Sequence, residues 1–512
     1  MKSLTILLLF FCAVEAIAQN PVGVFDNHLD IGNPKIRGSA KFDSVTQAYD
    51  IAGGGYNIWF NRDEFQFLYK KISGDFLLTA DFEFTGDTVN AVGHRKIGWM
   101  VRESTDEGAA NINACKHFNG LTVLQWRPYR GMFMRDPEDE IFFAKQGGQT
   151  IQVQRMGKKV SMWIAHPGEP LQFVGSHEMD GMKDSVLVGI YICSHDSNVL
   201  AHARVWNVRI DRQIQNDFSS NPNFKATPVR DELGSRLEIL DVADGSRKVI
   251  HEAAGRFEAP NWMPDGKHLL FNEKGSLYTI SVDGGMPQKL NTGTVDHNNN
   301  DHVISFDGKM LGISSHREGL AGGGSTIYVM PLSGGNPRQI TQKTPSYLHG
   351  WSPNGKELVF VAMRDEKVYN IYKVSPDDGR EVQLTFNKTG HVDGPEYSPD
   401  GKYIYYNANP TGTMQIWRMK PDGSGKEQMT FDSYHNWFPH ISPDGKWMAF
   451  ISFQPDINPD DHPSYKKVML RLMPLTTGGG PRVIAYLYGG QGTVNVPSWS
   501  PDGKKIAFVS NF

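Results

Sequence analysis

Cysteine is scarce in this sequence, with three in 512 residues at positions 12, 115 and 193. No two of them have the C-x-x-C spacing of a thiolate metal site, so zinc fingers and zinc ribbons are excluded. Cys12 falls in a segment that we expect to be removed, which leaves Cys115 and Cys193. These two either form one disulfide in an oxidising compartment or pack as two small buried thiols.

The sequence also lacks a hydrophobic run long enough to span a membrane. The run "LTILLLFFCAVEAIA" near the start is too short, and it closes on the small-x-small pattern of Ala16–Ala18. We interpret residues 1–18 as a cleaved export signal. Phe10 and Phe11 precede Cys12, where a lipoprotein signal needs a small residue. The predicted product is exported, periplasmic or extracellular, with no membrane span and no lipid anchor.

No charge of one sign dominates. The chain has 52 Lys and Arg against 56 Asp and Glu, a formal net charge of −4. It has no basic footprint for nucleic acid, so we expect no nucleic-acid partner. P-loop, G-x-G-x-x-G, H-E-x-x-H and G-x-S-x-G motifs are also missing, which argues against nucleotide-binding proteins, zincins and serine hydrolases.

An eleven-residue motif, in contrast, recurs through the second half of the chain. Its copies are "NWMPDGKHLLF", "VISFDGKMLGI", "GWSPNGKELVF", "EYSPDGKYIYY", "HISPDGKWMAF" and "SWSPDGKKIAF". The Asp or Asn of each turn falls at Asp265, Asp307, Asn354, Asp400, Asp444 and Asp502, which are 42, 47, 46, 44 and 58 residues apart. This period is typical of propeller blades with four strands each.

Each repeat reads as a polar turn followed by a buried strand. Asp-Gly supplies the turn, and apolar runs such as "WMAFIS" supply the strand. The last copy stops after two expected strands, and residues 235–242 and 247–253 read as two strands without a turn motif of their own. Joining them would close the ring without an exposed sheet edge. The longest spacing contains "QPDINPDDHPSYKK", which we expect to be a surface loop of the fifth blade.

These repeats resemble the TolB-type (PD40, WD40-like) six-bladed β-propeller over residues 234–512. The first half differs: "GDFLLTADFEFTG", "KIGWMVRES" and "ARVWNVRI" alternate polar and apolar residues between frequent turns, as in a two-sheet sandwich. The sequence of this half resembles concanavalin-like (laminin-G or DUF1349 type) jelly-roll domains. The predicted fold class is therefore all-β, with a β-sandwich (jelly roll) at 20–212, a linker at 213–233 and a six-bladed β-propeller closed by a clasp of N- and C-terminal strands.

Aromatic residues of the sandwich are candidates for stacking on sugars. We select Trp126 and Tyr129, which stand at the expected end of a strand. Trp99 and Trp163 read more readily as sandwich core.

The propeller offers a second candidate site in the loops that precede each turn. Equivalent positions on neighbouring blades face one axis, so side chains distant in sequence converge there. His391 and His435 share one register, nine residues before their turns; His302 and His349 share another, five residues before theirs. The propeller residues predicted to bind ligand are His302, His349, His391, Asp393, His435, Asn436, Trp437 and Asn495, with Asp301 and Glu258 adding further oxygens.

Imidazoles and carboxylates in a funnel suit a polar ligand, a divalent metal or proton abstraction at a sugar carbon. Three functions follow. The protein recognises a glycan or a protein or peptide, it is a carbohydrate-active lyase or hydrolase, or it is a cell-envelope scaffold of TolB type. A catalytic residue and the identity of any metal stay open at this point, and funnel mouths can also be polar without binding anything.

Overall fold

The computed structural model describes residues 21–86, 92–212, 233–364, 367–476 and 478–512. Within these ranges every pairing between strands is antiparallel, and the only helical element is a 3₁₀ turn at Ala321–Gly324. The predicted export signal lies outside the described residues, and so does the predicted linker apart from Leu233. The predicted all-β class is confirmed.

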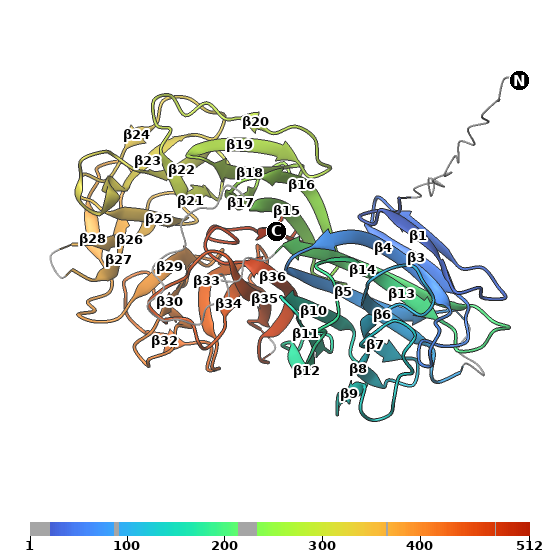
Figure 1. The fold of residues 1–512 in the computed structure, drawn as a ribbon. Helices are drawn as coiled ribbons and strands as arrows, with labels where there is room; N and C mark the ends of the chain where they lie inside the picture. The colour runs from blue at the N-terminus through green and yellow to red at the C-terminus, as the bar shows by residue number, and fades with distance from the viewer. Residues whose placement is uncertain (1–20, 87–91, 213–232, 365–366, 477) are drawn as a thin grey trace, which may run out of the picture.

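Two seven-stranded sheets form the N-terminal sandwich, seen on the right of Figure 1. One sheet has the order β1 (Asn27–Ile31), β4 (Phe65–Ser73), β13 (Ser185–Cys193), β6 (Lys96–Arg102), β7 (Asn111–His117), β8 (Thr122–Arg127) and β9 (Glu140–Phe142). The other has the order β12 (Gln172–Glu178), β11 (Lys159–Ala165), β10 (Thr150–Met156), β5 (Phe76–Thr85), β14 (Ala201–Arg212), β3 (Ala48–Gly53) and β2 (Ser39–Asp43).

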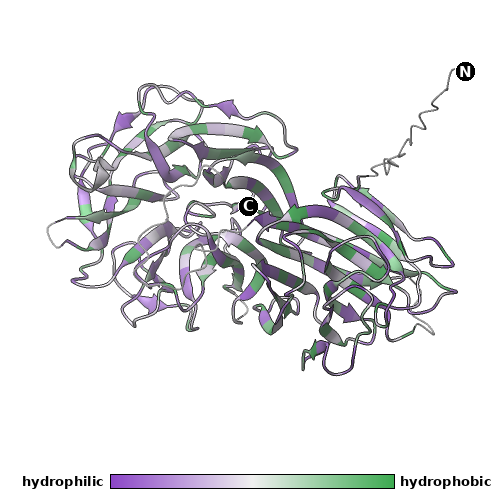
Figure 2. Ribbon diagram, viewed as in Figure 1, coloured by the Kyte–Doolittle hydropathy of each residue, from purple (hydrophilic) through white to green (hydrophobic). Residues whose placement is uncertain are grey.

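Alternating side chains from the two sheets fill the core between them. Trp99 is fully buried there, and its indole N–H donates to the carbonyl of Ile151 in the opposite sheet at 3.1 Å. The strands alternate hydrophobic and hydrophilic residues along their length, as Figure 2 shows. Cys115 and Cys193 are buried on the other face of the first sheet as free thiols, so the disulfide alternative is not realised.

The propeller consists of five four-stranded blades and one composite blade around a central axis (Figure 1). The first two blades are β17 (Phe257–Trp262), β18 (His268–Glu273), β19 (Ser276–Ser281), β20 (Gln288–Lys289) and β21 (Asn298–Ile304), β22 (Met310–Ser315), β23 (Thr326–Pro331), β24 (Arg338–Gln339). The third and fourth are β25 (Ser346–Trp351), β26 (Leu358–Met363), β27 (Tyr369–Val374), β28 (Glu381–Gln383) and β29 (Val392–Tyr397), β30 (Ile404–Ala408), β31 (Gln415–Met419), β32 (Glu427–Gln428). The fifth is β33 (His435–Ile441), β34 (Trp447–Phe453), β35 (Lys466–Pro474) and β36 (Arg482–Gly489).

The recurrence of the eleven-residue motif has a local physical cause in the hydrogen bonds of its turn, which the fourth blade illustrates. The Ser398 hydroxyl donates to the carboxylate of Asp400 at 2.8 Å and accepts the N–H of Tyr403 at 3.0 Å. Gly401 has φ +69°, a conformation that glycine adopts without the strain a side chain would bring. Serine, aspartate and glycine thus fix the turn that aligns β29 with β30.

The sixth blade joins the two ends of the propeller, as predicted. β37 (Lys505–Asn511) pairs with β15 (Gly234–Asp241), and β15 pairs with β16 (Arg247–Ala254). The innermost strand expected here is reduced to a single bridge between Trp499 and Ile506. β15 is thus paired along both of its edges, and the second edge of β37 carries the bridge to Trp499.

A buried ionic network connects the sandwich to the sixth blade. The Glu238 carboxylate on β15 accepts from Arg209 of β14 at 2.5 Å, from Arg247 of β16 at 2.8 and 3.0 Å, and from the hydroxyl of Ser510 on β37. Burial alone would raise the pKa of Glu238, but Arg209 and Arg247 hold it well below its usual value. One carboxylate thus binds strands from the sandwich and from both ends of the propeller.

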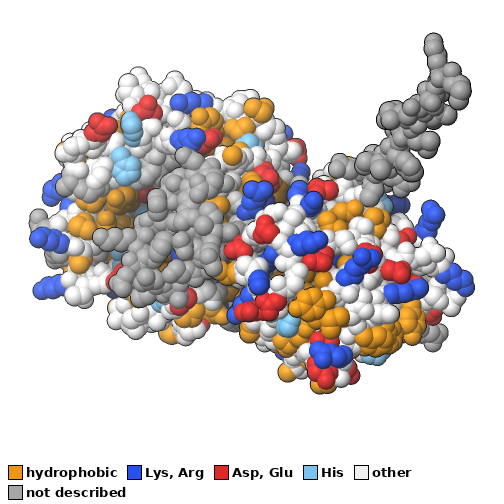
Figure 3. Space-filling model, viewed as in Figure 1, with side chains coloured by type: hydrophobic (Ala, Val, Ile, Leu, Met, Phe, Trp, Pro, Cys, Tyr) orange, Lys and Arg blue, Asp and Glu red, His pale blue; other side chains and the backbone are white. Residues whose placement is uncertain are grey.

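The exterior shows no single-sign electrostatic surface in the view of Figure 3, where basic and acidic side chains are interspersed over the sandwich. None of the helices among the described residues has the length and hydropathy needed to cross a membrane.

Candidate functional site

A cavity of about 320 Å³ lies where the first strands of several blades converge, within the range of small-ligand pockets. It takes residues from every blade except the first, including β21, β25, β27 and β29 and the loops around β34 and β36. Its polar lining consists of amides, carboxylates, imidazoles and phenols: Asn299, Asn300, Asp301, His316, Tyr347, His349, Tyr369, His391, Asp393, His462, Gln491 and Asn495. Val361 and Phe438 complete the wall.

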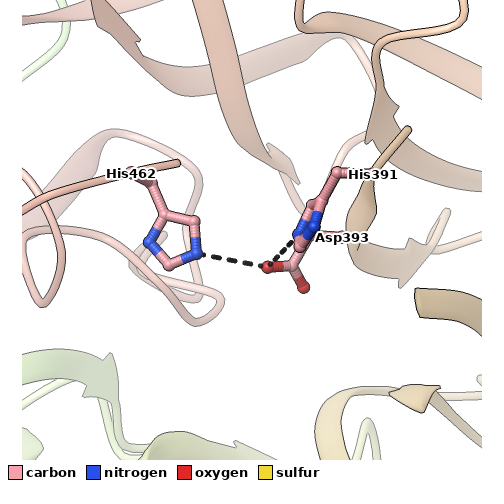
Figure 4. A group of neighbouring side chains, drawn as sticks. All are labelled: His391, Asp393 and His462. Carbon is pink, nitrogen blue, oxygen red and sulfur yellow. Dashed lines mark ion pairs between the residues drawn. The ribbon is translucent and has the colours of Figure 1, made fainter. Parts of the chain in front are cut away.

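Three of these residues form a compact group, shown in Figure 4. His391 and His462 point their Nε2 atoms at the same oxygen, Oδ2 of Asp393, at 3.7 and 3.5 Å. One ligand atom from each residue lies within 4.8 Å of those of the other two. His391 and Asp393 come from the start of β29, whereas His462 comes from the loop between β34 and β35.

His349 completes the group from the neighbouring blade. Its Nε2 lies 2.9 Å from Oδ1 of Asp393, an ion pair in which both side chains are largely buried. Burial would raise the pKa of Asp393, but the adjacent imidazoles, His349 foremost, hold it well below its usual value. Burial would lower the pKa of His349, but Asp393 and Asp301 together raise it. The pairing thus favours the ionised form of Asp393 and the protonated form of His349.

The pKa of Asp301 shifts in the opposite direction to that of Asp393. Burial raises its pKa to about 7, and the negative charges of Asp393 and Glu258 add to that effect although His349 opposes it. Tyr347 and Tyr369 stand on the same side of the cavity, with ring centroids 6.1 Å apart. The site therefore combines a carboxyl group poised near neutrality, an ionised carboxylate and aromatic rings.

The structure gathers around this cavity four of the residues predicted to bind ligand, together with Asp301, which the sequence offered as a further oxygen donor. His349, His391, Asp393 and Asn495 line it, and Asn495 accepts the N–H of Gly492 at 2.7 Å. Trp437 is fully buried behind them, with its ring centroid 4.5 Å from that of His462 and 5.5 Å from that of His391.

Three others lie elsewhere in the propeller. His302 is fully buried outside the cavity lining, and burial lowers its pKa to about 4. The N–H of Met414 donates to His435 at 3.3 Å. Asn436 is fully buried and donates to the side chains of Gln415, Thr430 and Asp432.

A one-residue difference in strand pairing separates His302 from His349. In the second blade His302 itself pairs with Ile313, and the unpaired bulge ends at Asp301. In the third blade the bulge is His349, between Leu348 and Gly350. Because side chains alternate between faces, Asp301 takes the place at the cavity that the shared register would have given His302.

The residues selected in the sandwich are not among those that line this cavity. Trp126 is 5% exposed within the sandwich core and stacks on His177 with ring centroids 3.9 Å apart. Tyr129 is 54% exposed on the sandwich surface. Trp163 faces the propeller, where the Lys467 ammonium lies 4.4 Å from its ring centroid. The sandwich aromatics and the funnel do not form one site.

Sequence reasoning missed His462. It belongs to "QPDINPDDHPSYKK", the insertion after the fifth turn, and therefore has no equivalent in the register of the other blades. The one available signal was a histidine between two aspartates and a proline in an unusually long loop, a pattern with no fixed relation to the propeller axis.

Comparison with known proteins supports the same assignment of fold. The family described as the TolB beta propeller domain matches residues 231–368 and 349–460. An uncharacterized protein of Agrobacterium fabrum is 45% identical over 281 residues, which cover 55% of this chain and 93% of that protein. The chain belongs to the TolB-type β-propeller family.

Two further relatives of this TolB-type chain are themselves described as TolB proteins. The solved structure of a putative TolB from Agrobacterium tumefaciens is 44% identical and superposes with a TM-score of 0.51, covering 55% of this chain and 99% of that one. The Tol-Pal system protein TolB of Anaeromyxobacter dehalogenans is 27% identical over 279 residues, 52% of this chain and 62% of that protein.

Proposed function

We propose that this protein is an exported recognition protein of the periplasm or extracellular space, and that its propeller funnel binds a glycan. The observation that carries the proposal is the convergence of Asp301, His349, His391, Asp393 and His462 in one cavity. Polar side chains from separate blades are brought together there around a space large enough for a sugar unit.

The composition of the wall favours a sugar over a peptide. Tyr347, Tyr369 and Phe438 offer ring faces, while Asn300, Gln491 and other amides and carboxylates suit hydroxyl groups. At about 320 Å³ the cavity is at the small end of ligand pockets and suits one or two sugar rings. A peptide would instead need an extended apolar groove or an exposed strand edge.

A carbohydrate-active enzyme is the second candidate, favoured by Asp301. A carboxyl group whose pKa is raised by burial to about 7 has the proton affinity that a general base or acid needs at neutral pH. A lyase would use it to remove a proton from a sugar carbon, and a hydrolase to protonate a leaving oxygen. A scaffold role, as in the Tol-Pal system of the Anaeromyxobacter relative, requires neither a small ligand nor turnover.

A panel of cell-wall and algal oligosaccharides tests these candidates by isothermal titration calorimetry. We expect saturable binding of at least one oligosaccharide, weakened at least tenfold in Asp301→Asn and Tyr369→Ala. Tyr129→Ala, a matched aromatic change on the sandwich, should bind as the wild type does. Loss of binding in Tyr129→Ala alone would place the site on the sandwich, and binding of peptides but no sugar would refute the glycan proposal.

Turnover is followed on the same panel. Absorbance near 235 nm reports the unsaturated product of a lyase, and a reducing-end assay reports hydrolysis. Affinity without new product supports recognition, whereas product formation that is lost in Asp301→Asn supports the enzyme.

A further inference from the structure

We propose that His391, Asp393 and His462 bind one divalent transition-metal ion, of the class of Zn²⁺, and that His349 positions the carboxylate for it. The proposal goes beyond ligand binding by the funnel, because it assigns the ion that would hold the ligand. It rests on the proposed function only in that last role, since the metal can be measured in the absence of any glycan.

The spacing of the three residues fits a bridging ion better than direct contact. The two nitrogen–oxygen separations of 3.7 and 3.5 Å lie outside or at the limit of a hydrogen bond. An ion bound about 2.1 Å from both atoms with a tetrahedral angle would hold them roughly 3.4 Å apart. One donor atom from each of the three residues already lies within 4.8 Å of the other two, so closure of the side chains around an ion would complete such a site.

An unpartnered atom marks the same place. Nε2 of His391 is buried and has no hydrogen-bond partner among the described residues, and it is the atom aimed at Asp393. A buried polar atom without a partner is destabilising, because it has lost its hydrogen bond to water. A metal ion would accept a lone pair from this nitrogen, which the carboxylate oxygen facing it cannot do.

The surroundings hold the donors in position. His349 occupies Oδ1 of Asp393 at 2.9 Å, which leaves Oδ2 directed at His391 and His462. The fully buried Trp437 packs against the rings of both histidines. Hydrogen bonds to a liganding carboxylate and packing around liganding imidazoles are the outer-shell features that fix ligand orientation in metal sites.

The donor types select the class of metal. Two imidazoles and one carboxylate suit Zn²⁺ and neighbouring transition metals, whereas Ca²⁺ and Mg²⁺ prefer oxygen donors alone. With three protein ligands, further coordination positions would be left for a ligand in the cavity. Hydroxyl or carboxylate oxygens of a glycan have the chemistry to occupy them.

Metal binding by the whole protein tests the site. After chelator treatment and dialysis, titration with Zn²⁺ should show one site per chain, and Co²⁺ should give the visible absorption of a protein-bound ion. His391→Ala and His462→Ala should each weaken Zn²⁺ binding at least tenfold, and His349→Gln should weaken it while leaving the Co²⁺ spectrum present but shifted.

His268→Gln is the matched control. His268 also pairs with an aspartate, Asp265 at 2.7 Å, but it lies at the exposed start of β18, outside the cluster. Its removal should leave Zn²⁺ affinity unchanged. Absence of a one-to-one site in the wild type, or equal affinity in the wild type, His391→Ala and His462→Ala, would overturn the proposal; a Tm measurement confirms that each variant is folded.

The metal site and the glycan proposal fail separately. A protein that binds Zn²⁺ but no oligosaccharide supports the metal site and refutes the glycan assignment. If an oligosaccharide binds with the same affinity in EDTA and in Zn²⁺, the ion has no part in holding the ligand, and that part of the inference is refuted.

Discussion

Glu238→Gln should destabilise the protein more than its single atom change suggests. The Glu238 carboxylate is the common acceptor for Arg209, Arg247 and Ser510, which belong to the sandwich, the first strands of the propeller and its last strand. Its side chain is fully buried, and those of Arg209 and Arg247 are 8% and 4% exposed. Glutamine keeps the shape but leaves two buried guanidinium groups without a counter-charge.

The expected loss follows from that burial. Removing one partner of a buried ion pair costs roughly 3–5 kcal/mol, because the remaining charges stay desolvated. Glu252 supplies the comparison on the adjacent strand: it pairs with Arg236 at 3.0 Å, but its own side chain is 51% exposed. An exposed pair of this kind contributes about 0–1 kcal/mol. Glu252→Gln should therefore have a small effect.

Urea unfolding at pH 7, followed by circular dichroism and tryptophan fluorescence, measures both variants. We expect Glu238→Gln to lower the free energy of unfolding by several times the amount seen for Glu252→Gln. Equal losses in the two variants would show that the network does not bind the two domains together as the contacts indicate.

Three more outcomes follow from the same structure. Because the folded protein lowers the pKa of Glu238, the stability that its charge contributes is fully present above the usual pKa of 4.5 and is lost as the pH falls toward the folded pKa. The difference in free energy of unfolding between wild type and Glu238→Gln should therefore shrink from pH 7 to about pH 3. A constant difference would contradict this. Burial raises the pKa of Cys115 and of Cys193 to about 11, so both thiols should react with Ellman's reagent at pH 8 only when urea unfolds the protein, and rapid reaction of the folded protein would contradict their burial. A Cβ added at Gly234 would lie 2.2 Å from the Phe512 ring, so Gly234→Ala should cost about 1–3 kcal/mol in urea unfolding, and Phe512→Ala should relieve part of that loss in the double variant. Additive losses there would argue against a steric origin.

The propeller could be predicted because its physics is local and repeated. In five of the six turns a serine hydroxyl donates to the Asp or Asn side chain two residues later, as at Ser398 and Asp400, so the turn can be recognised directly in the sequence. The clasp could also be predicted, because residues 235–253 contain two strands without a turn motif of their own. In the structure β15 from this segment pairs with β37. Repetition at a fixed period leaves few alternative folds.

The candidate site was only partly predictable, because convergence depends on strand register. His349 and His391 were found from their distance to the turn, and both line the cavity. His302 and His435 share those distances and lie elsewhere. A bulge displaced by one residue reverses the face to which a side chain points, and the sequence near His302 carries no signal of where the bulge falls.

Sequence alone therefore determined the strand-forming runs, the turns, the number of blades and the joining of the ends. Each of these depends on residues within a few positions of one another or on a pattern that recurs. Tertiary structure decided which imidazoles meet at Asp393, since His462 arrives from an insertion and His349 from another blade. Whether residues from different blades converge depends on the bulges and loop paths of all those blades together. No local stretch of sequence can therefore predict it.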